Sequence, residues 1–142
     1  MSVNVSIALN KGVRCIVLMK DGYVIKKDYG KYDLKNIYSD IIGVSKQALL
    51  LVRSYLNSGD CTDEEFVIES SNSIFVGWFD KLCAKNLYQS EFSELLELLN
   101  SLPIRYRIVH NEKPAAFQYL KGFNESSLKP KLSGLDLSVE EE

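Results

Sequence analysis

The fold is decided by residues 3–30, which read VNVSIALNKGVRCIVLMKDGYVIKKDYG. Val3, Val5, Ile7 and Leu9 alternate with small or polar residues, which is typical of a half-buried strand. The triplets NKG and KDG are turn signals, because glycine accepts a positive φ and Asp-Gly suits a type I′ hairpin turn. The stretch therefore predicts an antiparallel meander of three strands, at residues 3–9, 13–19 and 23–30.

After the meander the apolar period changes from two to that of a helix. Spacing from Leu34 to Leu56 predicts a long helix with Asp33 as its N-cap, in which Gly43 marks a close packing contact or a bend. Further elements follow as a strand at 65–69, helical spacing at 74–84 and 92–102, a strand at 104–109 and a short helix at 113–122. This order predicts one α/β domain over residues 1–122, followed by a flexible acidic tail at 123–142.

The composition is that of an ordinary soluble domain. The 142 residues are 46% apolar and 25% charged, and 17 basic against 19 acidic residues give a net charge of −2, which argues against a broad phosphate-binding surface. Cys15, Cys61 and Cys83 form no CxxC pair, so we expect free thiols rather than a zinc site or disulfides. We find no signal-peptide pattern and no membrane span, and we expect a cytoplasmic protein.

The element order resembles that of the ribonuclease H-like superfamily, over about residues 3–122. Three stretches are similar to family motifs: NIYSDIIGVSKQAL (36–49), with an acid one turn inside the first helix; SNSIFVGW (71–78), at the exit of the fourth strand; and HNEKPAAFQYL (110–120), the closing segment. The resemblance implies an α/β fold in which the meander and two further strands form a five-stranded mixed sheet flanked by helices.

The resemblance also implies a chemistry, two-metal phosphodiester hydrolysis. In that family, carboxylates from the first strand, first helix, fourth strand and last helix hold two divalent ions, about 4 Å apart and preferably Mg²⁺. The matching positions here are Asn10, Asp40, Asn72 and Ala115, or Leu9 and Ala116 if the first or last register is shifted by one. Each lost carboxylate removes an attraction of several kcal/mol even at an effective dielectric of about 20. We therefore predict a catalytically degenerate site, with no catalytic residues and no metal cofactor.

Several of these residues also have other interpretations. Asn72 is a good helix N-cap whatever its ancestry. Asp40 and Glu69 form an alternative metal-ligand pair, which would make Mg²⁺ a cofactor. His110, the only histidine, reads as a polar residue at a strand end.

Candidate binding surfaces lie outside the matched positions. Arg105 and Arg107 share one strand face, where they either contact phosphate or are simply solvated. The leucine-rich stretch at 92–102 is either core or a partner surface. Leu135, Leu137 and Val139, followed by three glutamates, either add a strand to a partner's sheet edge or remain disordered.

Three functions follow from these features. We favour a non-catalytic adaptor that acts through protein–protein contacts, with a protein partner expected. The alternatives are a nucleic-acid-binding pseudo-nuclease and a metal-dependent nuclease with altered ligands such as Asp40 and Glu69. A homodimer is compatible with the sequence. The small size and the Lys-, Asn- and Tyr-rich composition suit a viral accessory protein.

Overall fold

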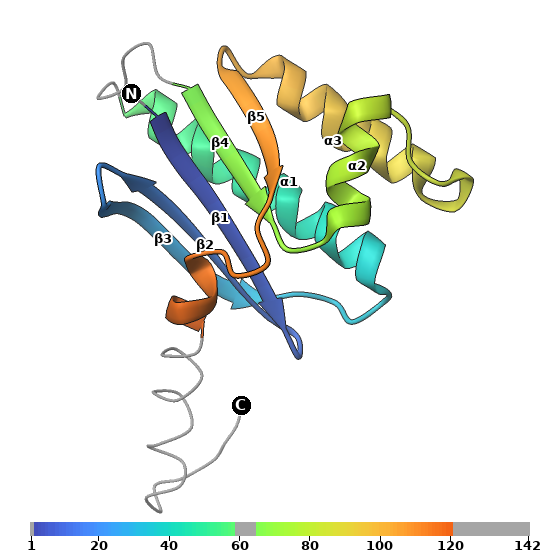
Figure 1. Cartoon of the computed structure of the whole chain (residues 1–142), viewed down its shortest axis with the longest axis horizontal. Helices are drawn as coiled ribbons and strands as arrows, with labels where there is room; N and C mark the ends of the chain where they lie inside the picture. The colour runs from blue at the N-terminus through green and yellow to red at the C-terminus, as the bar shows by residue number, and fades with distance from the viewer. Residues whose placement is uncertain (1, 59–64, 121–142) are drawn as a thin grey trace, which may run out of the picture.

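The computed structural model describes residues 2–58 and 65–120, and within them it forms one five-stranded mixed sheet. β1, β2 and β3 pair antiparallel, whereas β4 runs parallel to β1 and β5 runs parallel to β4 (Figure 1). The strand order is β3-β2-β1-β4-β5, with bounds β1 Ser2–Asn10, β2 Val13–Lys20, β3 Tyr23–Lys31, β4 Glu65–Ser70 and β5 Arg105–His110. The predicted sheet, a meander plus two further strands, is confirmed.

The two hairpin turns of the meander have the geometry that their sequence predicts. Lys11 and Gly12 have φ of 52° and 85°, and Asp21 and Gly22 have φ of 54° and 82°. Positive φ at both central residues is the mark of a type I′ turn, whose twist matches that of the flanking strands.

Alternation along β1 divides the sheet into two faces. Val3, Val5 and Ile7 point to the inner face, where they pack in the main core with α1 (Ile37–Asn57) and α3 (Gln89–Ser101). Ser6 and Ala8 point to the outer face, part of which is covered by a closing helical segment at residues 116–120. Figure 1 shows α1 and α3 on one side of the sheet and this closing segment, in orange, on the other.

The long helix α1 begins later than its periodicity suggests. Its N-cap is Asn36, whose side-chain oxygen accepts a hydrogen bond from the Ser39 N–H at 3.0 Å. The predicted cap Asp33 and the apolar Leu34 therefore lie outside the helix, and Leu34 is 71% exposed. The Asn36 side chain gives an acceptor to a backbone N–H that has no partner within the helix. This local hydrogen bond, rather than the apolar spacing, determines the residue at which α1 begins.

The sequence offers two roles for Gly43 and two for the leucine-rich stretch at 92–102, and in each case the structure excludes one of them. A Cβ built at Gly43 meets nothing within 4 Å, so neither a close packing contact nor steric need explains this glycine. In α3, Phe92, Leu95 and Leu99 are buried in the main core, which leaves the stretch as core rather than a partner surface.

A third helix and a cluster of aromatic rings complete the inner layer. α2 spans Ser73–Lys81 and is followed by a 3₁₀ turn η1 at Asn86–Tyr88. Trp78 of α2 contacts Tyr38 of α1 and Phe92 of α3, with ring centroids 5.1 Å and 5.7 Å apart. The rings join the three helices that border the inner side of β4 and β5.

Candidate functional site

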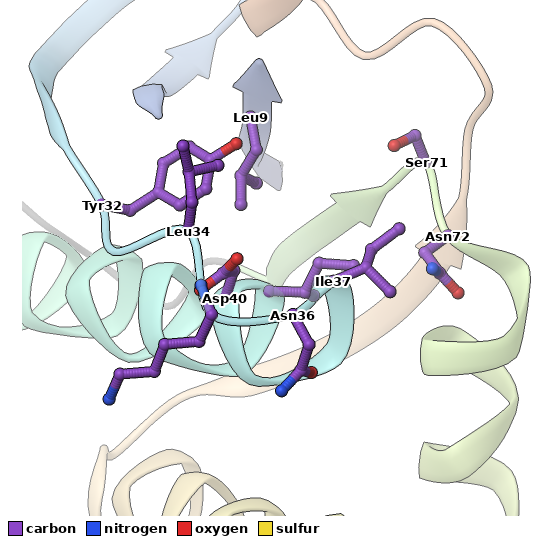
Figure 2. Close-up of a pocket in the computed structure, with 10 residues that line it drawn as sticks. Leu9, Tyr32, Leu34, Asn36, Ile37, Asp40, Ser71 and Asn72 are labelled. Carbon is purple, nitrogen blue, oxygen red and sulfur yellow. The ribbon is translucent and has the colours of Figure 1, made fainter. Parts of the chain in front are cut away.

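A cleft of about 420 Å³ opens where β1 and β4 end and α1 and α2 begin. Figure 2 shows Leu9, Tyr32 and Leu34 on the β1 side, Ser71 and Asn72 on the β4 side, and Ile37 and Asp40 projecting from the first turn of α1. The cleft is lined by Leu9, Tyr32, Leu34, Lys35, Asn36, Ile37, Asp40, Ile41, Ser71 and Asn72. Ends of neighbouring parallel strands meet at one edge of a sheet, which is where α/β folds commonly bind ligands.

The first-strand position in this cleft is Leu9 and not Asn10. Leu9 continues the inner-face alternation of Val5 and Ile7 and packs against the main core. Asn10 is exposed and does not line the cleft. Because the side-chain period of a strand is two, the assignment shifted by one residue is the one that reaches the cleft.

Asp40 and Asn72 do line the cleft. Asp40 Oδ1 accepts a hydrogen bond from the Lys35 N–H at 3.3 Å, which fixes the segment before α1 to its first turn. Asn72 Oδ1 accepts a hydrogen bond from the Phe75 N–H at 2.9 Å and thereby caps α2. The helix-cap interpretation of Asn72 is confirmed, and the same residue also forms part of the cleft wall.

A second hollow of about 330 Å³ adjoins the cleft, since Tyr32, Lys35 and Asp40 line both. Its lining is more polar and adds Lys31, Asp33, Ser39, Gly43, Val44, Gln47 and Glu91. The Ser39 hydroxyl donates a hydrogen bond to Glu91 at 3.0 Å, so the floor of this hollow links α1 to α3.

The last-helix position does not reach the cleft. Neither Ala115 nor Ala116 lines it. Ala116 is fully buried on the outer face, where its N–H donates to Ser6 Oγ at 2.9 Å. Of the four matched positions, the structure thus brings Asp40 and Asn72 together and places Leu9 beside them.

The alternative metal pair is not brought together. Phe66 and Ile68 of β4 point into the main core, so Glu69 projects from the outer face, whereas Asp40 lies on the inner side. Within residues 2–58 and 65–120, no group of three or more His, Cys, Asp or Glu side chains could hold a metal ion.

The two arginines of β5 also lie away from the cleft. Tyr106 and Ile108 pack against the main core, which leaves Arg105 and Arg107 on the outer face. Arg107 Nε is 3.3 Å from Glu65 Oε1, an ion pair with β4 across the parallel strands. The arginines therefore share a face, as predicted, but that face is not the one that holds the cleft.

His110 supports the β4 side of the cleft from outside. Its Nε2 lies 3.2 Å from the Ser71 carbonyl oxygen, and the neighbouring Asn111 N–H donates to the Ser70 carbonyl at 2.9 Å. These bonds hold the chain between β4 and α2 against the end of β5. The strand-end interpretation of His110 agrees with this position.

Two residues that sequence reasoning did not single out are the most exposed apolar groups of the cleft. Leu34 is 71% exposed and Ile37 is 61% exposed, although the helical spacing had assigned both to a buried face. The Asn36–Ser39 capping pair was the signal that could have placed Leu34 before the helix. Leu135, Leu137 and Val139 lie outside the described residues.

The cleft therefore combines apolar walls with few polar groups. Leu9, Leu34, Ile37 and Ile41 supply the apolar surface, and Asp40 is the single carboxylate among the described residues that line the cleft. Two hard divalent cations need several oxygen ligands with compensating negative charge. The residues present do not fit such a metal pair, and an apolar side chain with a few hydrogen bonds is the better match.

Among the described helices, none is long and apolar enough to cross a membrane.

Comparison with known proteins gives structural similarity without sequence similarity. No family model matches the chain, and no curated protein sequence does either. The structure of LC11-RNase H1, isolated from compost by a metagenomic approach, aligns with a TM-score of 0.64 at 12% identity over 87% of this chain and 95% of that chain. A second structure, LC11-RNase H1 in complex with an RNA/DNA hybrid, gives 0.62 at 9% identity, over 77% of this chain and 83% of the other.

An archaeal structure agrees with these two. RNase H1 from the halophilic archaeon Halobacterium salinarum NRC-1 aligns with a TM-score of 0.60 at 12% identity, over 78% of this chain and 83% of that chain. The strand order and the similarity to three solved structures together show that this chain has the ribonuclease H-like fold.

Proposed function

We propose that this chain is a non-catalytic binding module built on the ribonuclease H-like fold, and that its cleft contacts a protein partner. The observation that carries the proposal is the lining of the cleft at the ends of β1 and β4. Leu9 and Asn72 stand beside Asp40 where a two-metal enzyme would need further carboxylates.

The charge at the cleft supports a loss of metal chemistry. A neutral amide and a leucine next to one carboxylate cannot offset two divalent cations beside a phosphate. At 4 Å and an effective dielectric of about 20, each missing unit charge costs about 4 kcal/mol of attraction per cation charge. The residues that line the cleft therefore carry too little negative charge to bind two divalent cations.

The exposed apolar groups support a protein partner. Leu34 and Ile37 present apolar surface to solvent at the mouth of the cleft, next to Lys35, Asn36 and Asp40. Covering one such side chain contributes about 1–2 kcal/mol, and the polar neighbours can set the orientation of a bound segment. An apolar centre with a polar rim is the usual arrangement of a protein-binding patch.

The first test is a titration with Mg²⁺ and Mn²⁺ followed by thermal unfolding, with a labelled RNA–DNA hybrid in the same samples. The proposal expects the same melting temperature with metal and with chelator, and an intact hybrid. A metal-dependent rise in melting temperature, or cleavage that Asp40→Asn abolishes, would overturn the non-catalytic function.

The second test compares partner capture by matched surface variants. Leu34→Asp and Ile37→Asp change exposed cleft residues, whereas Leu50→Asp changes an exposed leucine of the same helix α1, 45% exposed. Leu50 is about 20 Å further along the helix axis than Ile37. Proteins that the wild type and Leu50→Asp retain, and that both cleft variants lose, are the expected result. Equal retention by all four proteins would contradict a role of the cleft.

A nucleic-acid-binding pseudo-nuclease is the second candidate. One specific observation favours it, namely the similarity to LC11-RNase H1, which is seen in complex with an RNA/DNA hybrid. The net charge of −2 speaks against a broad phosphate surface. Binding of a labelled hybrid that weakens steeply with salt would support this candidate, because phosphate contacts release counterions.

A further inference from the structure

One edge of the sheet is formed by β3, which pairs with β2 on one side and with no described strand on the other (Figure 1). The Tyr32 N–H donates to the Gly12 carbonyl oxygen at 3.0 Å, and this bond flanks the paired residues Val13 and Lys31. That pair is therefore one of the pairs that are not themselves hydrogen-bonded, which alternate with hydrogen-bonded pairs along an antiparallel ladder. It follows that the backbone N–H and C=O groups of Lys31, and of Lys27 four residues earlier, point away from β2 toward the open edge.

A bulge sets the length of edge that another strand can use. The register between β2 and β3 shifts between Leu18 and Met19, and Ile25 is the extra residue. A bulge bends its strand and interrupts regular pairing. The regular part of the open edge is therefore residues 26–31.

The meander is the basic part of the chain. Residues 11–35 have an excess of four positive charges, whereas the whole chain has a net charge of −2. Their seven basic side chains are Lys11, Arg14, Lys20, Lys26, Lys27, Lys31 and Lys35, and their three acidic ones are Asp21, Asp28 and Asp33. Asp28 is the only acid of β3, and its Oδ2 lies 3.0 Å from Arg14 Nη1. Since this acid is already paired, the three lysines of β3 make the edge positive.

Lys27 and Lys31 present their ammonium groups on one face of the edge. Side chains four residues apart in a strand point to the same side and lie about 13 Å apart. This side is the outer face of the sheet, because Tyr29 packs against the outer cluster. Lys27 Nζ lies 5.5 Å from the centroid of the Tyr29 ring and 5.2 Å from that of Tyr119, which holds it beside the edge. Two acids four residues apart on an added strand would face both lysines at once.

The charge of the edge decides between two kinds of added strand. A second copy of β3 would bring three lysines from each copy together, while each Asp28 is bound to its own Arg14. Like charges across a strand pair are destabilising, and lysines on an edge are a common means by which proteins avoid self-association. An acidic strand is attracted by the same lysines. The edge therefore disfavours a copy of itself and favours an acidic strand.

We propose that the open edge of β3 binds an extended acidic segment of a partner protein, which adds a strand to the sheet opposite residues 27–31. Backbone hydrogen bonds to Lys27 and Lys31 form the pairing, and acids four residues apart on the bound segment face the two lysine side chains. None of residues 27–31 lines the cleft, so this inference goes beyond the proposed function and does not depend on it.

The first experiment titrates two matched fluorescent peptides into the full chain. The blocked heptapeptide TETVTET carries glutamates four residues apart, and TKTVTKT carries lysines in their place. The acidic peptide should bind about tenfold more tightly, and Lys27→Glu/Lys31→Glu should reverse this preference. Lys81→Glu/Lys113→Glu changes two exposed lysines elsewhere by the same charge and should keep it. Equal affinity of wild type for both peptides, or no binding, overturns the proposal.

Two variants at Lys31 separate strand addition from simple charge attraction. Lys31→Ala removes the charge and keeps the N–H, whereas Lys31→Pro removes both. The proline breaks no bond to β2, because this N–H points outward, and an edge strand tolerates proline at such a position. Lys31→Pro should bind the acidic peptide several-fold more weakly than Lys31→Ala, at similar melting temperatures. Equal binding by the two variants overturns the proposal.

Hydrogen exchange tests the same pairing in wild type without a substitution. In the free protein the Asp28 and Gly30 amides point to β2 and should exchange slowly, whereas the Lys27 and Lys31 amides point outward and should exchange fast. Saturation with TETVTET should slow exchange at Lys27 and Lys31 several-fold and leave Asp28 and Gly30 little changed. Binding that leaves the Lys27 and Lys31 amides unprotected overturns the proposal.

Two other occupants of the edge would give different results. A single-stranded oligonucleotide that displaces the acidic peptide and binds Lys31→Pro and Lys31→Ala equally assigns the lysines to phosphate contacts and overturns the proposal. A dimer in sedimentation that Lys27→Glu/Lys31→Glu abolishes assigns the edge to a second copy and also overturns it.

A cleft variant keeps this proposal separate from the proposed function. Leu34→Asp should bind TETVTET as wild type does, and loss of binding in this variant places the peptide in the cleft and overturns strand addition at β3. Neither metal nor a hybrid enters these experiments, so metal-dependent cleavage would overturn the non-catalytic function and leave this result standing.

Discussion

A single buried hydroxyl joins the first strand to the closing segment. Ser6 is fully buried on the outer face, and its Oγ accepts a hydrogen bond from the Ala116 N–H, 110 residues away, at 2.9 Å. Ala116 stands at the start of the helical residues 116–120, where backbone donors have no partner within the helix. Ser6 therefore does for this helix what a local N-cap does for α1 and α2.

Ser6→Ala should destabilise the protein, because it leaves a buried N–H without an acceptor. The expected loss is about 1–3 kcal/mol in the free energy of unfolding, measured by urea denaturation. Ser2→Ala, at an exposed position of the same strand, is the control and should change little. Equal stability of Ser6→Ala and wild type would show that this bond contributes nothing.

Burial also decides the reactivity of one thiol. Cys15 is fully buried on β2, and desolvation raises the pKa of its thiol to about 11. At pH 8 only about one thiol in a thousand is then ionised, whereas an ordinary cysteine is partly thiolate. Cys83 is exposed, so a reagent can reach it in the folded protein.

Labelling with iodoacetamide at pH 8 should therefore modify Cys83 and spare Cys15 in the native protein. Peptide-level mass spectrometry separates the two sites, and urea should make Cys15 reactive. Since the folded state holds the proton that the unfolded state releases near pH 9, this cysteine should also lower stability as the pH rises from about 9 to 11. Rapid native labelling of Cys15 would contradict the burial.

At the scale of elements, α2 is defined by its two ends. Asn72 caps its start, and Leu82 ends it with φ 55° in the left-handed region, where glycine is the usual residue. The Leu82 and Cys83 N–H groups both donate to the Trp78 carbonyl oxygen. Leu82 is 62% exposed, so little packing offsets the strain of its backbone.

Leu82→Gly should stabilise the protein by about 0.5–1 kcal/mol, because glycine adopts this conformation without a Cβ clash. Leu82→Ala removes the same side-chain contacts but keeps the Cβ, so it should give no gain. Thermal unfolding of the three proteins measures the difference. A loss of stability in Leu82→Gly would mean that the leucine side chain contributes more than its strain costs.

At the scale of the whole molecule, the cleft depends on four separate segments. β1 supplies Leu9, the chain after β3 supplies Leu34, α1 supplies Asp40, and the chain after β4 supplies Asn72. Leu9 and Asn72 are distant in sequence and meet because β4 pairs with β1 in the sheet. Carboxylates placed at Leu9 and Asn72 should therefore join Asp40, whereas one at Asn10 should not.

The double variant Leu9→Asp/Asn72→Asp should gain a metal-dependent melting temperature. If 1 mM Mn²⁺ binds with a Kd of about 100 µM, it stabilises the folded state by about 1.4 kcal/mol, which raises the melting temperature by a few degrees. Asn10→Asp/Asn72→Asp is the matched control and should show no metal effect. Both variants keep an N-cap at residue 72, because Asp caps helices as well as Asn does.

A chelator should reverse the gain and give the variant a melting temperature below that of wild type, since Leu9 packs against the core. An equal metal effect in both double variants would show that the cleft does not distinguish Leu9 from Asn10.

Local sequence patterns predicted much of the fold and part of the site. The turn triplets and the period-two alternation of residues 3–30 determined the meander, because both depend on neighbours in the chain. Asn72 could be predicted as a helix cap for the same reason, because its hydrogen-bond partner Phe75 is only three residues away. The alternation of Val3, Val5, Ile7 and Leu9 already placed Leu9, and not Asn10, on the core face.

Tertiary structure decided what depends on partners far away in the chain. Pairing of β4 with β1 brought Asn72 to Asp40, and the sheet between them separated Asp40 from Glu69. The bond from Ala116 to Ser6 fixed the closing segment to the outer face, away from the cleft. Residue order does not specify which face a distant helix covers, because that choice follows from packing of whole surfaces rather than from neighbouring residues.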